Sequence, residues 1–230
     1  MQQRIQVWDW PVRVFHWSMV LVVAGAIATG LIGGNAMEYH GQLGVALSGL
    51  LGFRLAWGVV GTRTARFISF VRGPQAILQS LRGQWRGIGH NPLGALSVLA
   101  LLGVFGFQAV SGLFTNDDIA FNGPLRKLVS KEFSDIITGI HHSMLPFLIA
   151  LIVLHVGAIM FYRVVKKEDL VRPMLRGWKP ADADAARQQN SPLNWLALII
   201  AMAVGIGCAV LASGIWMPAP APVPVSTPAW

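Results

Sequence analysis

Hydrophobic and polar positions divide the chain into five long apolar runs separated by polar segments. Each run approaches the roughly 20 residues that a membrane-spanning helix needs. The runs cover about residues 11–33, 40–60, 92–114, 139–162 and 192–216. This pattern predicts an all-α integral membrane protein, in which a four-helix transmembrane bundle is followed by a fifth, C-terminal transmembrane helix.

Composition supports the membrane class. Of the 230 residues, 54% are hydrophobic and 12% are charged, whereas a soluble domain carries about 25% charged residues. The net charge of +8 comes from basic residues that lie between the apolar runs. We therefore interpret them as topology signals and contacts to anionic membrane lipid, not as a nucleic-acid surface. The single cysteine, Cys208, permits no intrachain disulfide, thiolate cluster or covalent C-x-x-C-H haem site.

Loop charges predict the orientation in the membrane. The N-terminus and the segments 61–91 and 163–190 are rich in arginine and lysine. The segment 34–39 holds only Glu38, and 115–138 mixes acids with bases. By the positive-inside rule, the N-terminus is cytoplasmic and the fifth helix ends outside.

Histidine is costly inside a membrane, yet the chain places it repeatedly in or beside apolar runs. His141 and His155 are 14 residues apart. At about 100° per residue they lie within roughly 40° of one another on one helix face, about 21 Å apart. The adjacent His142 points roughly 140° away from His155, so we expect it to face another helix, the outer interface or a haem propionate.

Helix depth matches the histidines in two pairs. Successive helices run in opposite directions, so His16 lies level with His155 near the inner surface, and His40 lies level with His141 near the outer one. Neutral imidazole is a strong axial ligand for iron, and helix bundles hold cofactors between facing helices. The pattern predicts two non-covalent b haems with these four residues as iron ligands.

Other roles compete with haem ligation. Membrane histidines also form interhelical hydrogen bonds, proton relays or zinc sites, but the spans near these residues contain no acid that would assist a zinc ion or a proton path. Arg54 either extends to the interface or neutralises a haem propionate. His90 either starts the third helix ahead of Pro92 or lies near a quinone or a propionate.

Four segments together resemble the bacterial cytochrome b561 family, which includes the cytochrome b subunit of nickel–iron hydrogenases. They are WDWPVRVFHW (8–17), FRLAWGVVGTRTARF (53–67), GHNPLG (89–94) and HHSMLPFLIALIVLH (141–155). The resemblance covers roughly residues 4–175. It implies a four-helix core with two b haems, ligated once from helix 1, once from helix 2 and twice from helix 4. The matching residues are His16, His40, His141 and His155.

The resemblance also implies a function in the bacterial inner membrane. We expect electron transfer across the membrane between the quinone pool and a redox partner, such as a periplasmic c-type cytochrome. Arg13 and His90 are candidate quinone contacts near the inner haem, and His142 near the outer one. An alternative is a haem-bearing anchor subunit of a larger oxidoreductase, such as a hydrogenase-like complex; another is a haem-free structural or transport protein.

The C-terminal part departs from a four-helix pattern. We expect a di-haem domain over residues 1–175, a cytoplasmic linker over 176–191, the fifth helix over 192–216 and a proline-rich periplasmic tail over 217–230. Proline-rich sequence of this kind is typically extended. The added helix either docks a periplasmic redox protein or stabilises a homodimer.

Overall fold

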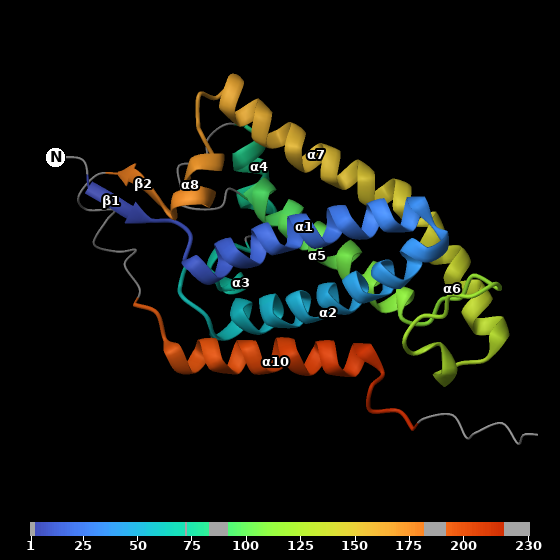
Figure 1. Cartoon of the computed structure of the whole chain (residues 1–230). Helices are drawn as coiled ribbons and strands as arrows, with labels where there is room; N and C mark the ends of the chain where they lie inside the picture. The colour runs from blue at the N-terminus through green and yellow to red at the C-terminus, as the bar shows by residue number, and fades with distance from the viewer. Residues whose placement is uncertain (1–2, 72, 83–91, 182–191, 219–230) are drawn as a thin grey trace, which may run out of the picture.

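The computed structural model describes residues 3–71, 73–82, 92–181 and 192–218 (Figure 1). Five helical stretches in this part are long and apolar enough to cross a membrane. They are α1 (Trp10–Ile32), α2 (Met37–Val60) with the short η1 (Gly34–Ala36) ahead of it, α5 (Pro92–Gly112), α6 (Lys131–Ser143) with α7 (Leu145–Val164), and α10 (Trp195–Ser213). The predicted fold class, an all-α membrane protein with five spans, is confirmed.

Capping residues determine where the helices start and stop. The side chain of Asp9 accepts a hydrogen bond from the backbone N–H of Val12 at 2.8 Å, and a proline stands in the first turn of α1. Asn194 caps α10 in the same way, accepting from Ala197 at 3.2 Å. Gly214 ends α10 in the left-handed conformation that glycine adopts without strain.

The fourth predicted helix differs from the structure. It begins earlier than residue 139, because Ser130 caps α6 through the backbone N–H of Phe133. It is also interrupted at Met144, since Pro146 in the first turn of α7 has no N–H to continue the hydrogen-bond ladder. His141 and His155 therefore lie on two consecutive helices rather than on one.

The two ends of the bundle are built differently (Figure 1). At one end, β1 (Gln3–Gln6) pairs antiparallel with β2 (Trp178–Ala181), beside α8 (Val171–Arg176). The short helices α3 (Phe67–Phe70) and α4 (Pro74–Leu81) lie at the same end. We call this the strand end. The opposite end, which we call the loop end, carries η1, α6 and the connection 113–130 with η2 (Arg126–Leu128). Residues 182–191 of the predicted linker and 219–230 of the predicted tail lie outside the described residues.

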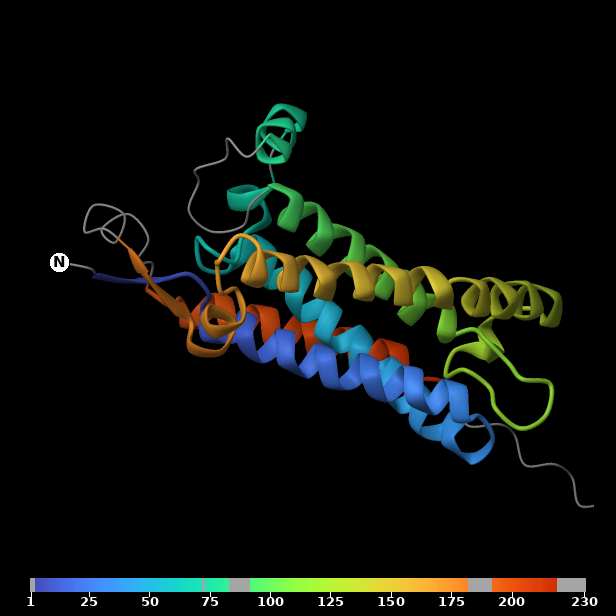
Figure 2. The ribbon, with the colours of Figure 1, turned by 90° about the horizontal axis from the view of Figure 1, so that it is seen from above.

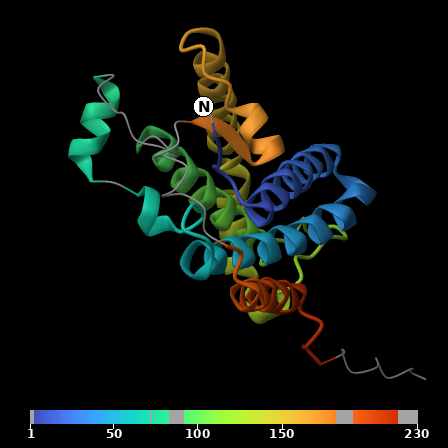
Figure 3. The ribbon, with the colours of Figure 1, turned by 90° about the vertical axis from the view of Figure 1, so that its left-hand side faces the viewer.

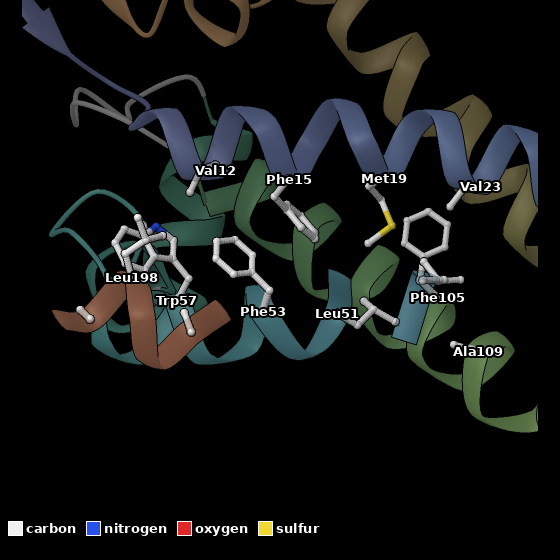
Figure 4. Close-up of a cluster of buried hydrophobic side chains, with 14 of the residues drawn as sticks. Val12, Phe15, Met19, Val23, Leu51, Phe53, Trp57, Phe105, Ala109 and Leu198 are labelled. Carbon is white, nitrogen blue, oxygen red and sulfur yellow. The ribbon is translucent and has the colours of Figure 1, made fainter. Parts of the chain in front are cut away.

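A buried apolar cluster joins α1, α2, α5 and α10 (Figure 4). Phe15 of α1 points toward Phe53 of α2, and Met19 points toward Leu51 of α2. The rings of Phe53 and Trp57 stack with centroids 6.2 Å apart. Leu198 closes the cluster from α10. Figures 2 and 3 show α10 lying along α2 at the margin of the bundle, away from α7.

Candidate functional site

A pair of histidines meets at the loop end. His40 lies in the first turn of α2 and His141 in the last turn of α6, and their ring centroids are 6.1 Å apart. A bond from a first-row metal to an imidazole nitrogen is about 2 Å long, so one metal ion has room between the two rings. The two rings are T-shaped to one another rather than stacked.

These two histidines line a cavity of about 480 Å³ at the loop end. This volume is within the range typical of ligand sites. The walls come from α1, α2, α5, α6, the first residues of α7 and the connection between α5 and α6, and they are mainly apolar with many glycines. Gly30 allows the close approach of His40, because a Cβ there would lie 3.1 Å from the imidazole ring. Gly112 does the same for His141 at 3.1 Å.

Hydrogen bonds hold the Nδ1 atoms of this pair. His40 Nδ1 lies 2.8 Å from the backbone carbonyl of Ala26 and must donate to it. His141 Nδ1 lies 2.9 Å from Ser111 Oγ, and that hydroxyl in turn donates to the carbonyl of Gln108 at 3.2 Å. The serine oxygen is therefore the acceptor for His141. Both rings are thereby held as the tautomer that leaves the Nε2 lone pair free for a metal.

A second pair lies toward the strand end. His155 of α7 contacts Ser97 of α5, with Nδ1 and Oγ 3.3 Å apart. His16 of α1 is close enough to His155 for electrostatic interaction. Its ring lies edge-on to Trp17, with centroids 5.0 Å apart. Within the part of the chain that the structure describes, the buried Nδ1 of His16 has no hydrogen-bond partner.

Two serines of α5 are functional candidates that the sequence analysis missed. Ser97 and Ser111 are 14 residues apart, the same spacing as that between His155 and His141. Helix α5 runs antiparallel to α6 and α7, so equal spacing places one serine beside each histidine. The equal 14-residue spacing of the two serines and the two histidines is a sequence signal from which this pairing could have been predicted.

Replacing Ser111 with alanine tests its supporting role. Loss of an outer hydrogen-bond partner typically weakens metal binding about 10–100-fold, so if His141 ligates a haem, we expect that haem to dissociate faster by about this factor. Transfer of haem from the detergent-purified protein to excess apomyoglobin measures the rate. Ser48→Ala is the matched control, because within the described residues the Ser48 hydroxyl donates to the carbonyl of Gly44 of its own helix at 2.9 Å. Equal rates in both variants would contradict the assignment.

The remaining predicted residues have different positions. His142 lines the loop-end cavity beside His141, with ring centroids 6.2 Å apart. Arg13 donates to the carbonyl of Leu175 at 2.7 Å and so fastens α1 to α8 at the strand end. His90 lies outside the described residues.

Arg54 is buried and does not extend to the interface. Only 4% of its surface is exposed, and its guanidinium lies 4.6 Å from the centroid of the Phe67 ring. Among the described residues, its Nη1 atom has no hydrogen-bond partner. A buried cation with a free donor is suited to hold an anionic group.

Asp9 organises a buried polar network that the sequence analysis did not identify. Besides capping α1, its carboxylate accepts from Trp57 Nε1 at 2.9 Å and from Thr62 Oγ1 at 2.5 Å. Asp9 is 2% exposed and Trp57 is completely buried, so Trp57 is a core residue and not a membrane-interface residue. The negative charge of Asp9 also interacts with Arg54. The network joins the strand ends of α1 and α2.

The rim of the loop-end cavity carries a fixed negative charge. Asp117 lines the cavity, and its Oδ1 accepts from the backbone N–H groups of Ile119, Phe121 and Ala120 at 2.8–2.9 Å. These hydrogen bonds, that from Ile119 foremost, hold the pKa of the Asp117 carboxyl below its ordinary value. The carboxylate therefore stays ionised at neutral pH.

Comparison with known proteins identifies the family of the chain. It matches the family described as prokaryotic cytochrome b561 over residues 7–177. Neither the curated proteins nor the solved structures contain a significant match. The matched segment comprises α1 to α8, about three quarters of the chain, and includes every histidine described above. The chain therefore belongs to the prokaryotic cytochrome b561 family, whose members are membrane cytochromes that bind haem b and transfer electrons.

Proposed function

We propose that this protein holds two b haems, one toward each end of the bundle, and carries electrons across the membrane between the quinone pool and a redox partner. The observation that carries the proposal is the arrangement of four histidines in two pairs. In the loop-end pair, the Nδ1 atom of each ring forms a hydrogen bond, which leaves the Nε2 atom for the iron. His40 and His141 would ligate one haem iron, and His16 and His155 the other. A bound haem supplies a centre for one-electron transfer.

The protein's own residues would position and insulate these centres. The apolar helices exclude water, and burial is one of the factors that set a haem potential. The serine and carbonyl partners orient the imidazoles. Arg54 lies on α2 near the strand end with a free donor, which supports a role in holding a propionate there.

Quinone contacts belong to the same proposal. His142 lines the loop-end cavity, so it is a candidate for a quinone or a propionate at that end. Arg13 is a weaker candidate, because its guanidinium already donates a hydrogen bond to the carbonyl of Leu175. Its Nε has no hydrogen-bond partner within the described residues. His90 remains a candidate on sequence grounds alone.

The orientation follows from the charges of the two ends. Basic residues of segments 63–66 and 163–179 predominate in the connections at the strand end, whereas the loop end mixes acids, including Asp117 at the cavity rim, with the bases Arg126, Lys127 and Lys131. By the positive-inside rule this arrangement supports a cytoplasmic strand end and a periplasmic loop end in the bacterial inner membrane. A periplasmic c-type cytochrome would then meet the protein at the loop end.

Vesicles provide the test. Purified protein is reconstituted into liposomes that contain trapped ferricyanide, and dithionite is added outside. We expect about two haems per chain by pyridine haemochrome assay and reduction of the trapped ferricyanide well above that in protein-free vesicles. Prompt reduction of the haems by a quinol in the bilayer is expected as well. One haem per chain, or ferricyanide reduction no faster than in empty vesicles, would contradict the proposal. Haem reduction only when a large catalytic subunit co-purifies would instead favour an anchor subunit.

A further inference from the structure

The fifth helix lies outside the family match but is closely packed against the family core. The match ends at residue 177, whereas α10 begins at Trp195. Glycines make the approach of α10 to α2 possible: a Cβ on Gly52 would lie 2.6 Å from Cys208 Sγ, and one on Gly205 would lie 2.9 Å from the carbonyl oxygen of Gly49. Among the described elements, the contact between α10 and α2 is the most extensive.

The loop-end terminus of α10 is also packed against the connection between α5 and α6. Gly214 has a φ of +68°, and a Cβ there would lie 2.8 Å from the carbonyl oxygen of Pro124 and 2.6 Å from Met217 Cε. Ala212, Leu113 and Leu125 form a buried cluster at this point, against which Met217 packs. The C-terminal end of α10 thus packs against the outer side of the connection between α5 and α6.

The same connection forms a wall of the loop-end cavity. Phe121 and Pro124 line the cavity, and so does Gly41 of α2. Phe121 packs against Gly41, where a Cβ would lie 3.1 Å from its ring. Gly41 directly follows His40, one of the two histidines that meet in the cavity. The contact of Gly214 with Pro124, the chain segment 121–124 and the packing of Phe121 against Gly41 therefore connect the end of α10 to the neighbourhood of His40.

We propose that α10 is a positioning element for the loop-end haem site: its C-terminal end holds the segment 121–125 as a wall that keeps water out of the cavity. This inference rests on the proposed function, because it assumes a haem between His40 and His141. Water that reaches a haem favours its more highly charged oxidised form, so a displaced wall lowers the potential of that haem. The pair at the strand end is remote from Gly214, and its haem is unaffected.

The test compares potentials of the two haems in full-length variants. In Gly214→Val, the β-branched side chain is strained at a positive φ and collides with Pro124. We expect spectroelectrochemical titration to show two haems, with the loop-end potential lowered and the strand-end potential unchanged. The loop-end signal is the one that disappears in His141→Ala. Met217→Ala is a milder variant that removes the same packing without backbone strain, and we expect a smaller shift of the same sign.

Gly207→Val is the matched control, because nothing lies within 4 Å of a Cβ at Gly207 on the same helix. Both potentials should equal those of the unaltered protein. Unchanged potentials in both Gly214→Val and Met217→Ala, or equal shifts of both haems, would overturn the positioning role. An unaltered protein that binds fewer than two haems would refute the proposed function itself, which separates the two failures.

Discussion

Replacing His141 with alanine is expected to reduce the haem content from about two to about one per chain. His141 and His40 lie 6.1 Å apart between ring centroids and both line the loop-end cavity; if they hold a haem as proposed, the loss of one imidazole would leave its iron with a single protein ligand. His40→Ala should give the same result. Either substitution should leave the haem between His16 and His155 in place, because that pair lies toward the other end of the bundle. Pyridine haemochrome assay and reduced-minus-oxidised spectra measure both effects.

His142→Ala is the control for this experiment. It removes a neighbouring imidazole from the same helix turn and the same cavity, but we do not assign it to the iron. We expect both haems to remain, with at most a shift in the potential of the loop-end haem. If His142→Ala loses a haem while His141→Ala retains both, the ligand at this end is His142. If all three variants retain two haems, the loop-end pair does not bind iron.

Replacing Asp9 with leucine is expected to destabilise the protein by about 3–5 kcal/mol, the usual cost of removing one partner from a buried charged network. The indole N–H of Trp57 and the hydroxyl of Thr62 would lose their acceptor, and the buried charge of Arg54 would lose its nearby counter-charge. The cap of α1 would also be lost. Because His16 lies two turns into α1, we expect the strand-end haem to dissociate first on heating.

Thermal unfolding in detergent, followed by tryptophan fluorescence and by the haem spectrum, measures this effect. Asp118→Asn is a suitable control, because the Asp118 side chain is 67% exposed and pairs with Lys131 at the surface, and asparagine tolerates the positive φ of 56° at this position. Exposed ion pairs contribute about 0–1 kcal/mol, so its unfolding temperature should barely change. Asp9→Asn keeps an acceptor oxygen and should fall between the two. Equal stability of Asp9→Leu and Asp118→Asn would show that the network is not important for the fold.

The sequence alone predicted the membrane class, the five spans and the family. These properties depend on features that are local in the chain: the length of apolar runs, the sign of loop charges and short motifs. The depth of each histidine also follows from local information, since a spanning helix advances by a constant rise per residue. For this reason helix depth is sufficient to predict the pairing of His40 with His141, and in the fold these two rings lie together.

Tertiary structure alone decided which polar groups surround these residues. The burial of Trp57 and Arg54 depends on how α1 and α3 pack against α2, which no local pattern encodes. The tautomer of His141 depends on Ser111, 30 residues away along the chain, and the segment that lines the cavity at Pro124 packs against the end of α10, a distant part of the sequence. Apolar periodicity determines that a helix crosses the membrane, but the shapes of small residues such as Gly52 and Gly205 determine which neighbour it can approach.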